Sequence, residues 1–180
     1  HKLASSLELT YDETRSLLKK RYDGYHFVAN VPGIYKPLSL LNTFKYMRPE
    51  DYWFETGTPS YLVELLKHTH YDLYELANTE TDADVLNSID STSSNPVPVI
   101  YQSGYLTIKD YDSRFGIYKL GFPNLEVEEG FVKYLLPFYT SVSAPKTPFE
   151  IGRFVREVEN GDYDAFFRRL QSFFADTPYE

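Results

Sequence analysis

Apolar side chains recur every three or four positions in several stretches of this chain, which is the spacing of one face of a helix. Three helices are predicted in the first half: one capped by Thr10 and ending near Arg21, one from Pro37 to about Met47, and one capped by Thr58 and ending near His68. The first is the best defined, because Glu13 follows Thr10 at the spacing of a capping box.

Short extended segments are predicted around turn-forming residues in the same half. Gly24 and Pro32-Gly33 mark two turns, so Tyr25 to Phe27 and Ile34-Tyr35 form a small hairpin or two short strands. The aromatic run Tyr52-Trp53-Phe54 is expected to be a buried extended piece.

The stretch from Thr79 to Pro98 is rich in Thr, Ser, Asn and Asp, and we place a subdomain boundary there, with a short helix at Ala83 to Ile89. A helix from Val97 to Ser103 follows, and Gly104 is expected to end it in the left-handed conformation. Two strands at about 105–109 and 116–120 flank a polar turn and predict an antiparallel hairpin. A helix followed by a hairpin is typical of a winged helix.

Three further helices are predicted toward the C-terminus. Asn124 caps the first, its Glu126 suits the positive end of the helix dipole, and Pro137 should kink or end it. The second begins with a capping box at Thr147 to Glu150, and the third follows Gly161, with Asp162 as its cap. The predicted fold class is mainly α with short β-hairpins.

Composition narrows the class of protein. The chain has 180 residues, 18 Lys and Arg against 26 Asp and Glu, a formal net charge of -8 and no cysteine. This charge argues against a broad electrostatic grip on nucleic acid, and the predicted helix from Val97 to Ser103 contains no Lys or Arg. No apolar run approaches the ~20 residues of a membrane helix. We expect a cytoplasmic location, and an internal piece of a longer protein because the chain begins without Met.

The common catalytic patterns are not found in the sequence. It contains no phosphate loop, no Gly-x-Ser-x-Gly elbow, no His-Glu-x-x-His and no Glu-x-Lys pair. His68 and His70 stand two residues apart on a predicted helix and do not share a face, so we expect no metal site there. The basic clusters Lys19 to Arg21 and Arg168-Arg169 are expected to be solvated helix faces.

One turn holds the densest group of side chains that could take part in catalysis, and we call it the signature turn. It consists of Tyr22, Asp23, Gly24, Tyr25, His26 and Phe27. Asp23 could orient the His26 imidazole as a general base in a hydrolytic site. We favour the structural interpretation, in which hydrogen bonds and aromatic packing hold a turn. No catalytic residue is assigned.

Six blocks together carry a family resemblance. They are RYDGYHF (21–27), IYKPLSL (34–40), YWFETG (52–57), YQSGYLTI (101–108), LGFPNLEV (120–127) and LQSFFADTPY (170–179). In this order the chain resembles the bacterial predicted AAA-ATPase-like family, common in Bacteroidetes, whose members typically carry a C-terminal PD-(D/E)XK nuclease domain. It departs from the usual family pattern at Arg21, where Trp is common, and at Lys36, where Asn is common.

The resemblance implies that the ATPase core precedes this region and that the nuclease follows it. Residues 1–90 would then be a helical lid-like region, and 97–180 a winged-helix-like region with helices leading to the nuclease. The implied function is non-catalytic coupling of nucleotide state to the nuclease-like domain, with ATP and Mg²⁺ bound by the longer protein and no cofactor in this piece. Its expected partners are the rest of its own chain and a second copy in a homo-oligomer. The alternative is a stand-alone winged-helix module that binds DNA or a partner protein.

Overall fold

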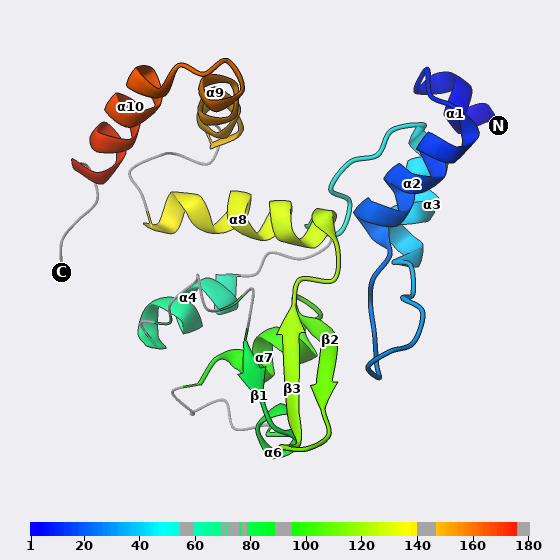
Figure 1. The fold of residues 1–180 in the computed structure, drawn as a ribbon, viewed down its shortest axis with the longest axis vertical. Helices are drawn as coiled ribbons and strands as arrows, with labels where there is room; N and C mark the ends of the chain where they lie inside the picture. Colours follow the sequence, from blue (N-terminus) through cyan, green and yellow to red (C-terminus); the bar gives the residue numbers. More distant parts are fainter. Residues whose placement is uncertain are drawn as a thin grey trace. The chain divides into compact units, whose positions relative to one another are not determined.

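The computed structural model describes residues 1–54, 60–69, 71, 76, 79–88, 95–139 and 147–175 (Figure 1). The chain forms two compact units, His1–Gly130 and Phe131–Glu180. This division lies later than the boundary that we placed between Thr79 and Pro98, because a short strand in that stretch joins the same sheet as the following hairpin. The assignment of 1–90 and 97–180 to separate functional regions stays a prediction.

The described residues of the first part of unit 1 include four helices. They are α1 (Lys2–Ser6), α2 (Tyr11–Tyr22), α3 (Pro37–Tyr46) and α4 (Ser60–Thr69). The capping box of α2 is confirmed: Thr10 Oγ1 accepts a hydrogen bond from the Glu13 N–H at 3.2 Å, and Glu13 Oε2 accepts one from the Thr10 N–H at 2.8 Å. The predicted cap of α4 at Thr58 lies outside the described residues.

A three-stranded antiparallel sheet follows, with the strand order β1-β3-β2. The elements of this part are β1 (Glu80–Thr81), α6 (Ala83–Leu86), α7 (Val97–Gln102), β2 (Thr107–Asp112) and β3 (Ile117–Gly121). The predicted hairpin is present, although both strands begin and end later than expected. The helix at Ala83 ends at Leu86, three residues earlier than predicted. Two-residue β1 was not predicted, since so short a polar strand has no alternating pattern.

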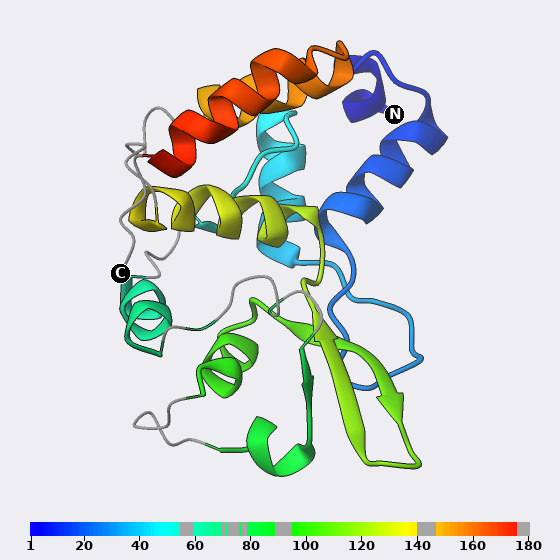
Figure 2. The ribbon, with the colours of Figure 1, turned by 60° about the vertical axis from the view of Figure 1, so that its left-hand side comes forward.

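The sheet and the helices beside it share a buried apolar core. Helix α7 lies against the sheet (Figures 1 and 2) and buries Val97 and Ile100, while Ile108 is buried from β2 and Leu120 from the central strand β3. Gly104, with φ +81°, follows α7 in the predicted left-handed conformation. The structure is therefore mainly helical with a small antiparallel sheet.

Helix α8 (Leu125–Tyr139) begins in the first unit and continues into the second. Pro137 lies in its last turn, close to where we expected it to kink or end the helix. Helices α9 (Thr147–Glu159) and α10 (Tyr163–Ala175) then form a hairpin. Gly161 has φ +71° at the connection, and Asp162 caps α10 by accepting from the Ala165 N–H at 3.1 Å. The side chain of Thr147, the predicted cap of α9, is outside the described part.

Candidate functional site

The signature turn joins the helical part of unit 1 to the sheet. Its first residue, Tyr22, is fully buried at the end of α2. The Tyr22 hydroxyl donates to the Glu50 carbonyl at 2.9 Å and accepts from Thr43 Oγ1 at 2.9 Å. These two bonds link α2 to α3 and to the segment that leads to Trp53, since Thr43 lies on α3 and Glu50 follows it.

The middle of the turn packs directly against the residues around the hairpin. Gly24 has φ +114°, and a Cβ at this position would lie only 2.1 Å from the Pro123 carbonyl oxygen. The Tyr25 hydroxyl donates to the Gly104 carbonyl at 3.2 Å. The His26 N–H donates to Thr107 Oγ1 at 2.7 Å, and that hydroxyl donates back to the His26 carbonyl at 2.9 Å.

The acid and the imidazole of the turn are used separately. Asp23 Oδ1 accepts from the Gly24 N–H at 2.8 Å, as an Asx turn does, while His26 Nδ1 is buried without a hydrogen-bond partner. Phe27 is 76% exposed. The described geometry thus lacks the Asp-oriented imidazole of the hydrolytic alternative, and it agrees with a structural turn.

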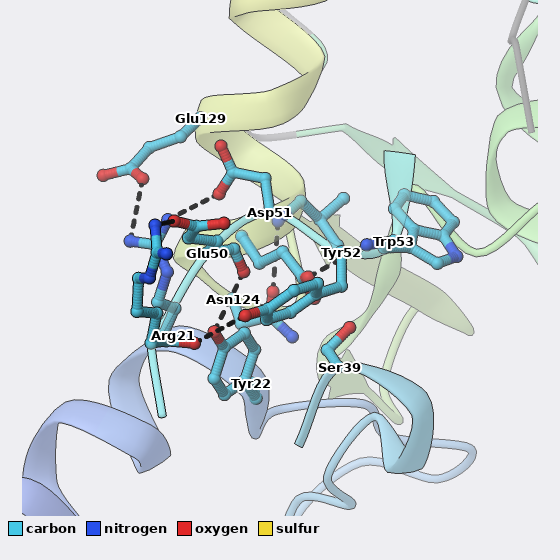
Figure 3. A network of polar contacts seen from close by, with 12 residues as sticks. Arg21, Tyr22, Ser39, Glu50, Asp51, Tyr52, Trp53, Asn124 and Glu129 are labelled. Atoms are coloured by element: carbon cyan, nitrogen blue, oxygen red, sulfur yellow. Dashed lines mark hydrogen bonds and ion pairs between the residues drawn. The ribbon is translucent and has the colours of Figure 1, made fainter. Parts of the chain in front are cut away.

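Arg21, one residue before the turn, is the centre of an ion-pair network (Figure 3). Its guanidinium contacts Asp51 at 2.5 Å and Glu129 at 3.1 Å, and only 17% of the side chain is exposed. Our expectation that Arg21 is a solvated residue is therefore wrong. The partners come from positions 30 and 108 residues away, which no local pattern reveals.

Glu126, in the first turn of α8, is completely buried. Its Oε1 accepts a hydrogen bond from the Trp53 N–H at 3.0 Å, while Oε2 has no hydrogen-bond partner. Burial raises the pKa of this carboxyl, and the nearby Ser39 hydroxyl and the Trp53 N–H oppose that rise. We expected Glu126 to be a dipole-compensating residue at a helix start, and that pattern did not predict its burial.

Buried polar atoms without partners concentrate around the start of α8. Asn124 caps this helix as predicted, with Oδ1 accepting from the Val127 N–H at 3.2 Å, but its Nδ2 has no partner. In the part of the chain that the structure describes, five buried side-chain atoms lack a partner: Arg21 Nε, His26 Nδ1, Ser39 Oγ, Asn124 Nδ2 and Glu126 Oε2. Three of these five atoms belong to residues labelled in Figure 3, namely Arg21, Ser39 and Asn124, and a fourth belongs to Glu126, which accepts from the backbone N–H of Trp53. We call this network, Arg21, Ser39, Asp51, Trp53, Asn124, Glu126 and Glu129, the α8 anchor.

An aromatic cluster packs beside the α8 anchor. The Lys36 ammonium lies 5.1 Å from the Tyr25 ring centroid and 4.9 Å from that of Trp53, and burial lowers the pKa of Lys36. Phe54 presses against α8, because a Cβ on Gly130 would lie 2.2 Å from the Phe54 ring. A glycine in the middle of a helix was the available sequence signal for this close contact.

The basic side chains of the β2–β3 hairpin, which a DNA-binding winged helix would use to contact phosphates, have partners within the chain. Lys109 donates to the Pro123 carbonyl at 3.3 Å, and Lys119 lies 3.8 Å from Glu80. The Arg114 guanidinium lies 4.9 Å from the Phe115 ring at the tip of the hairpin. Each of these three basic side chains therefore has a partner within the chain, and for Lys119 and Glu80 that pair lies at the surface.

The described residues contain no group of three or more His, Asp or Glu side chains that could hold a metal ion. His68 is exposed near the end of α4, and His70 lies outside the described residues. None of the described helices is both long and apolar enough to cross a membrane.

Comparisons with known proteins identify a distant relative of this chain. No family model matches the chain, and no solved structure matches it. Over 169 residues the chain is 28% identical to "Uncharacterized protein in vnfD 5'region" of Azotobacter chroococcum mcd 1, a match that covers 92% of this chain and 32% of that protein. The chain thus spans about a third of the length of this curated relative. The relative's name describes no activity, so the family resemblance of the six sequence blocks stays a prediction.

Proposed function

We propose that this chain is the non-catalytic lid and winged-helix segment of a longer AAA-ATPase-like protein, and that it couples nucleotide state to an appended nuclease-like domain. The observation that carries the proposal is the α8 anchor. It joins the start of α8 to α2, through Arg21 and Glu129, and to the segment around Trp53, through Glu126, and the same helix continues beyond Gly130 into the second unit.

A helix held in this way is suited to transmit movement. Arg21 at the end of α2 contacts Asp51 and Glu129 together, so a shift of α2 cannot leave both ion pairs unchanged. Two-state rearrangements of packed helices are a common means of passing a ligand signal between domains. The helical part around α2 and α3 would act as the lid, and α7 with its hairpin as the winged helix. This assignment rests on fold analogy and on the resemblance.

ATP and Mg²⁺ would be bound by the ATPase core of the longer protein. The two basic residues near the start of α8 are engaged within the chain, because Arg21 is paired with two carboxylates and Lys36 lies over two aromatic rings. The role of this chain in the proposal is structural: its α8 anchor keeps the start of α8 in place. Its partners would be the remainder of its own polypeptide, with a second copy in a homo-oligomer.

The test uses the longer protein that contains this chain. We expect its nuclease activity or oligomeric state to change with bound nucleotide, and we expect Arg21→Met to weaken that response while leaving basal activity in place. Arg114→Met, at the exposed tip of the hairpin, is the matched control. An activity and oligomeric state that are indifferent to nucleotide and to disruption of the Phe131 to Phe138 helix would refute coupling.

The second candidate is a stand-alone winged-helix module that contacts a partner protein or DNA. Phe115 favours a protein contact, since it is 64% exposed at the hairpin tip and carries the Arg114 guanidinium over its ring. A gel-shift titration of the chain separates the DNA version. Micromolar binding that weakens steeply with salt would support a DNA-binding module, despite the net charge of -8.

A further inference from the structure

The Glu126 carboxyl has too few hydrogen-bond donors for a buried charge. An ionised carboxylate can accept about four hydrogen bonds, and a buried one is costly without donors or a paired cation. Glu126 accepts one, from the Trp53 N–H, and Oε2 accepts none. The buried Ser39 Oγ nearby also lacks a partner; its hydroxyl could accept a hydrogen bond from a protonated Oε2 or donate one to an ionised Oε2.

Most of the positive charge near Glu126 already has a partner. Arg21 is held by Asp51 and Glu129, and Lys36, whose pKa Glu126 raises, lies over two aromatic rings. A negative Glu126 would therefore be a third carboxylate beside two cations. Asp51 raises the pKa of Glu126, and Arg21 lowers it.

The positive end of the α8 dipole favours an ionised Glu126. Such an effect is modest at a helix terminus, even where the terminus is partly buried. Removing an ion from water without full compensation costs more than this effect returns. Desolvation is therefore the larger effect at Glu126, which is fully buried.

We propose that Glu126 is a proton-operated latch on α8: as a neutral carboxyl it holds the first turn of the helix against Trp53 and Ser39, and its ionisation weakens this hold. The charged and titratable groups that interact with it are Arg21 and Tyr22 from α2, Tyr25 from the signature turn, Lys36 before α3, and Asp51 before Trp53. Glu129, three residues further along α8, pairs with the same Arg21. Control of coupling by this latch rests on the proposed function, whereas the latch itself is a property of unit 1.

The direction of the pH dependence follows from proton linkage. An unfolded Glu ionises with a pKa of about 4.3, and the folded carboxyl holds its proton to higher pH because burial raises its pKa. Between these two pKa values the folded state binds more protons than the unfolded state. The folding equilibrium constant should therefore fall up to about tenfold per pH unit across this window, because one extra proton is bound in the folded state.

The test uses Trp53, the one tryptophan of the chain, as a fluorescent probe. The backbone N–H of Trp53 donates directly to Glu126, so its indole ring lies on the residue that the latch holds. Trp53 emission and urea unfolding are measured from pH 4 to 9 in the wild type, in Glu126→Gln and in Glu128→Gln, a control at an exposed position of the same turn. The wild type and Glu128→Gln should show the same transition in emission and loss of stability as pH rises. Glu126→Gln should lack both. An identical pH dependence in all three proteins would overturn the latch.

A direct measurement covers the case in which Glu126→Gln fails to fold. The carboxyl ¹³C resonances of the wild-type protein report each Glu titration separately. We expect one buried Glu to titrate above the ordinary range, with the Trp53 amide shift following the same curve. If every Glu titrates at its ordinary pKa, the latch is refuted. Neither measurement involves nucleotide or nuclease, so failure of the latch is distinguishable from failure of coupling.

Discussion

Two arginines of this molecule make almost the same contacts and have different consequences. Arg21 bridges Asp51 and Glu129, at 2.5 and 3.1 Å, and Arg169 bridges Glu157 and Glu150, at 2.5 and 3.2 Å. The first pairs join residues 30 and 108 positions apart, whereas the second join residues 12 and 19 positions apart within one helical hairpin.

The surroundings explain the difference. Arg21 adjoins the fully buried Tyr22 and acts on the fully buried Glu126, so its ion pairs hold together parts of a packed core. Among the side chains described in α9 and α10, none is fully buried. Arg169 therefore joins two helices locally, while Arg21 determines how distant segments meet. Removing one partner of an ion pair costs more where the charge left behind is buried than where it is exposed.

The largest expected effect tests the close packing near the α8 anchor. Gly24→Ala would place a Cβ 2.1 Å from the Pro123 carbonyl oxygen at φ +114°, and we expect it to lower the free energy of unfolding by about 3 kcal/mol or more. Gly161→Ala, between α9 and α10, is the control. Gly161 has φ +71° with open space around it, so this variant should lower the free energy of unfolding by only about 1 kcal/mol. Equal losses in urea unfolding would contradict the comparison.

Replacement of the two arginines is expected to have the next largest effect. Arg21→Met removes the cation from two carboxylates at a mostly buried position and should lower the free energy of unfolding by about 2 kcal/mol. Arg169→Met should have a smaller effect that shrinks further in high salt, since the Arg169 side chain is more exposed than that of Arg21, 28% against 17%, and no described side chain of α9 or α10 is fully buried. Denaturant unfolding at low and high salt distinguishes the two. A larger loss for Arg169→Met would reverse our ranking.

The sequence predicted what depends on neighbouring residues. Thr10 and Glu13 predicted the start of α2, Asn124 predicted the start of α8, and alternating residues predicted the hairpin, because caps and turns involve positions a few residues apart. Burial of Glu126 and pairing of Arg21 were not predicted. Their partners come from distant segments, so periodicity and spacing contain no signal for them. The candidate site was thus predicted only as the signature turn.

The smallest effect concerns one hydroxyl of the turn. Tyr22→Phe removes the hydrogen bond to the Glu50 carbonyl and should lower the free energy of unfolding by about 1–2 kcal/mol, because a partly buried acceptor loses its donor. Tyr163→Phe, at the start of α10, is the control, since Tyr163 is 58% exposed. Thermal or urea unfolding of the pair should show a loss only for Tyr22→Phe, and equal stability of both variants would contradict the role of this hydroxyl.

Amide hydrogen exchange tests most directly whether the Arg21 network fixes the start of α8. The Val127 and Glu128 amides, which donate to Oδ1 and the carbonyl of Asn124, report on the first turn of α8, and the Leu120 amide in β3 serves as the internal reference. In Arg21→Met the α8 amides should exchange about tenfold faster relative to Leu120 than in the wild type, and in Arg169→Met they should not change. Unchanged protection of Val127 and Glu128 in Arg21→Met, or an equal acceleration in both variants, would contradict the account.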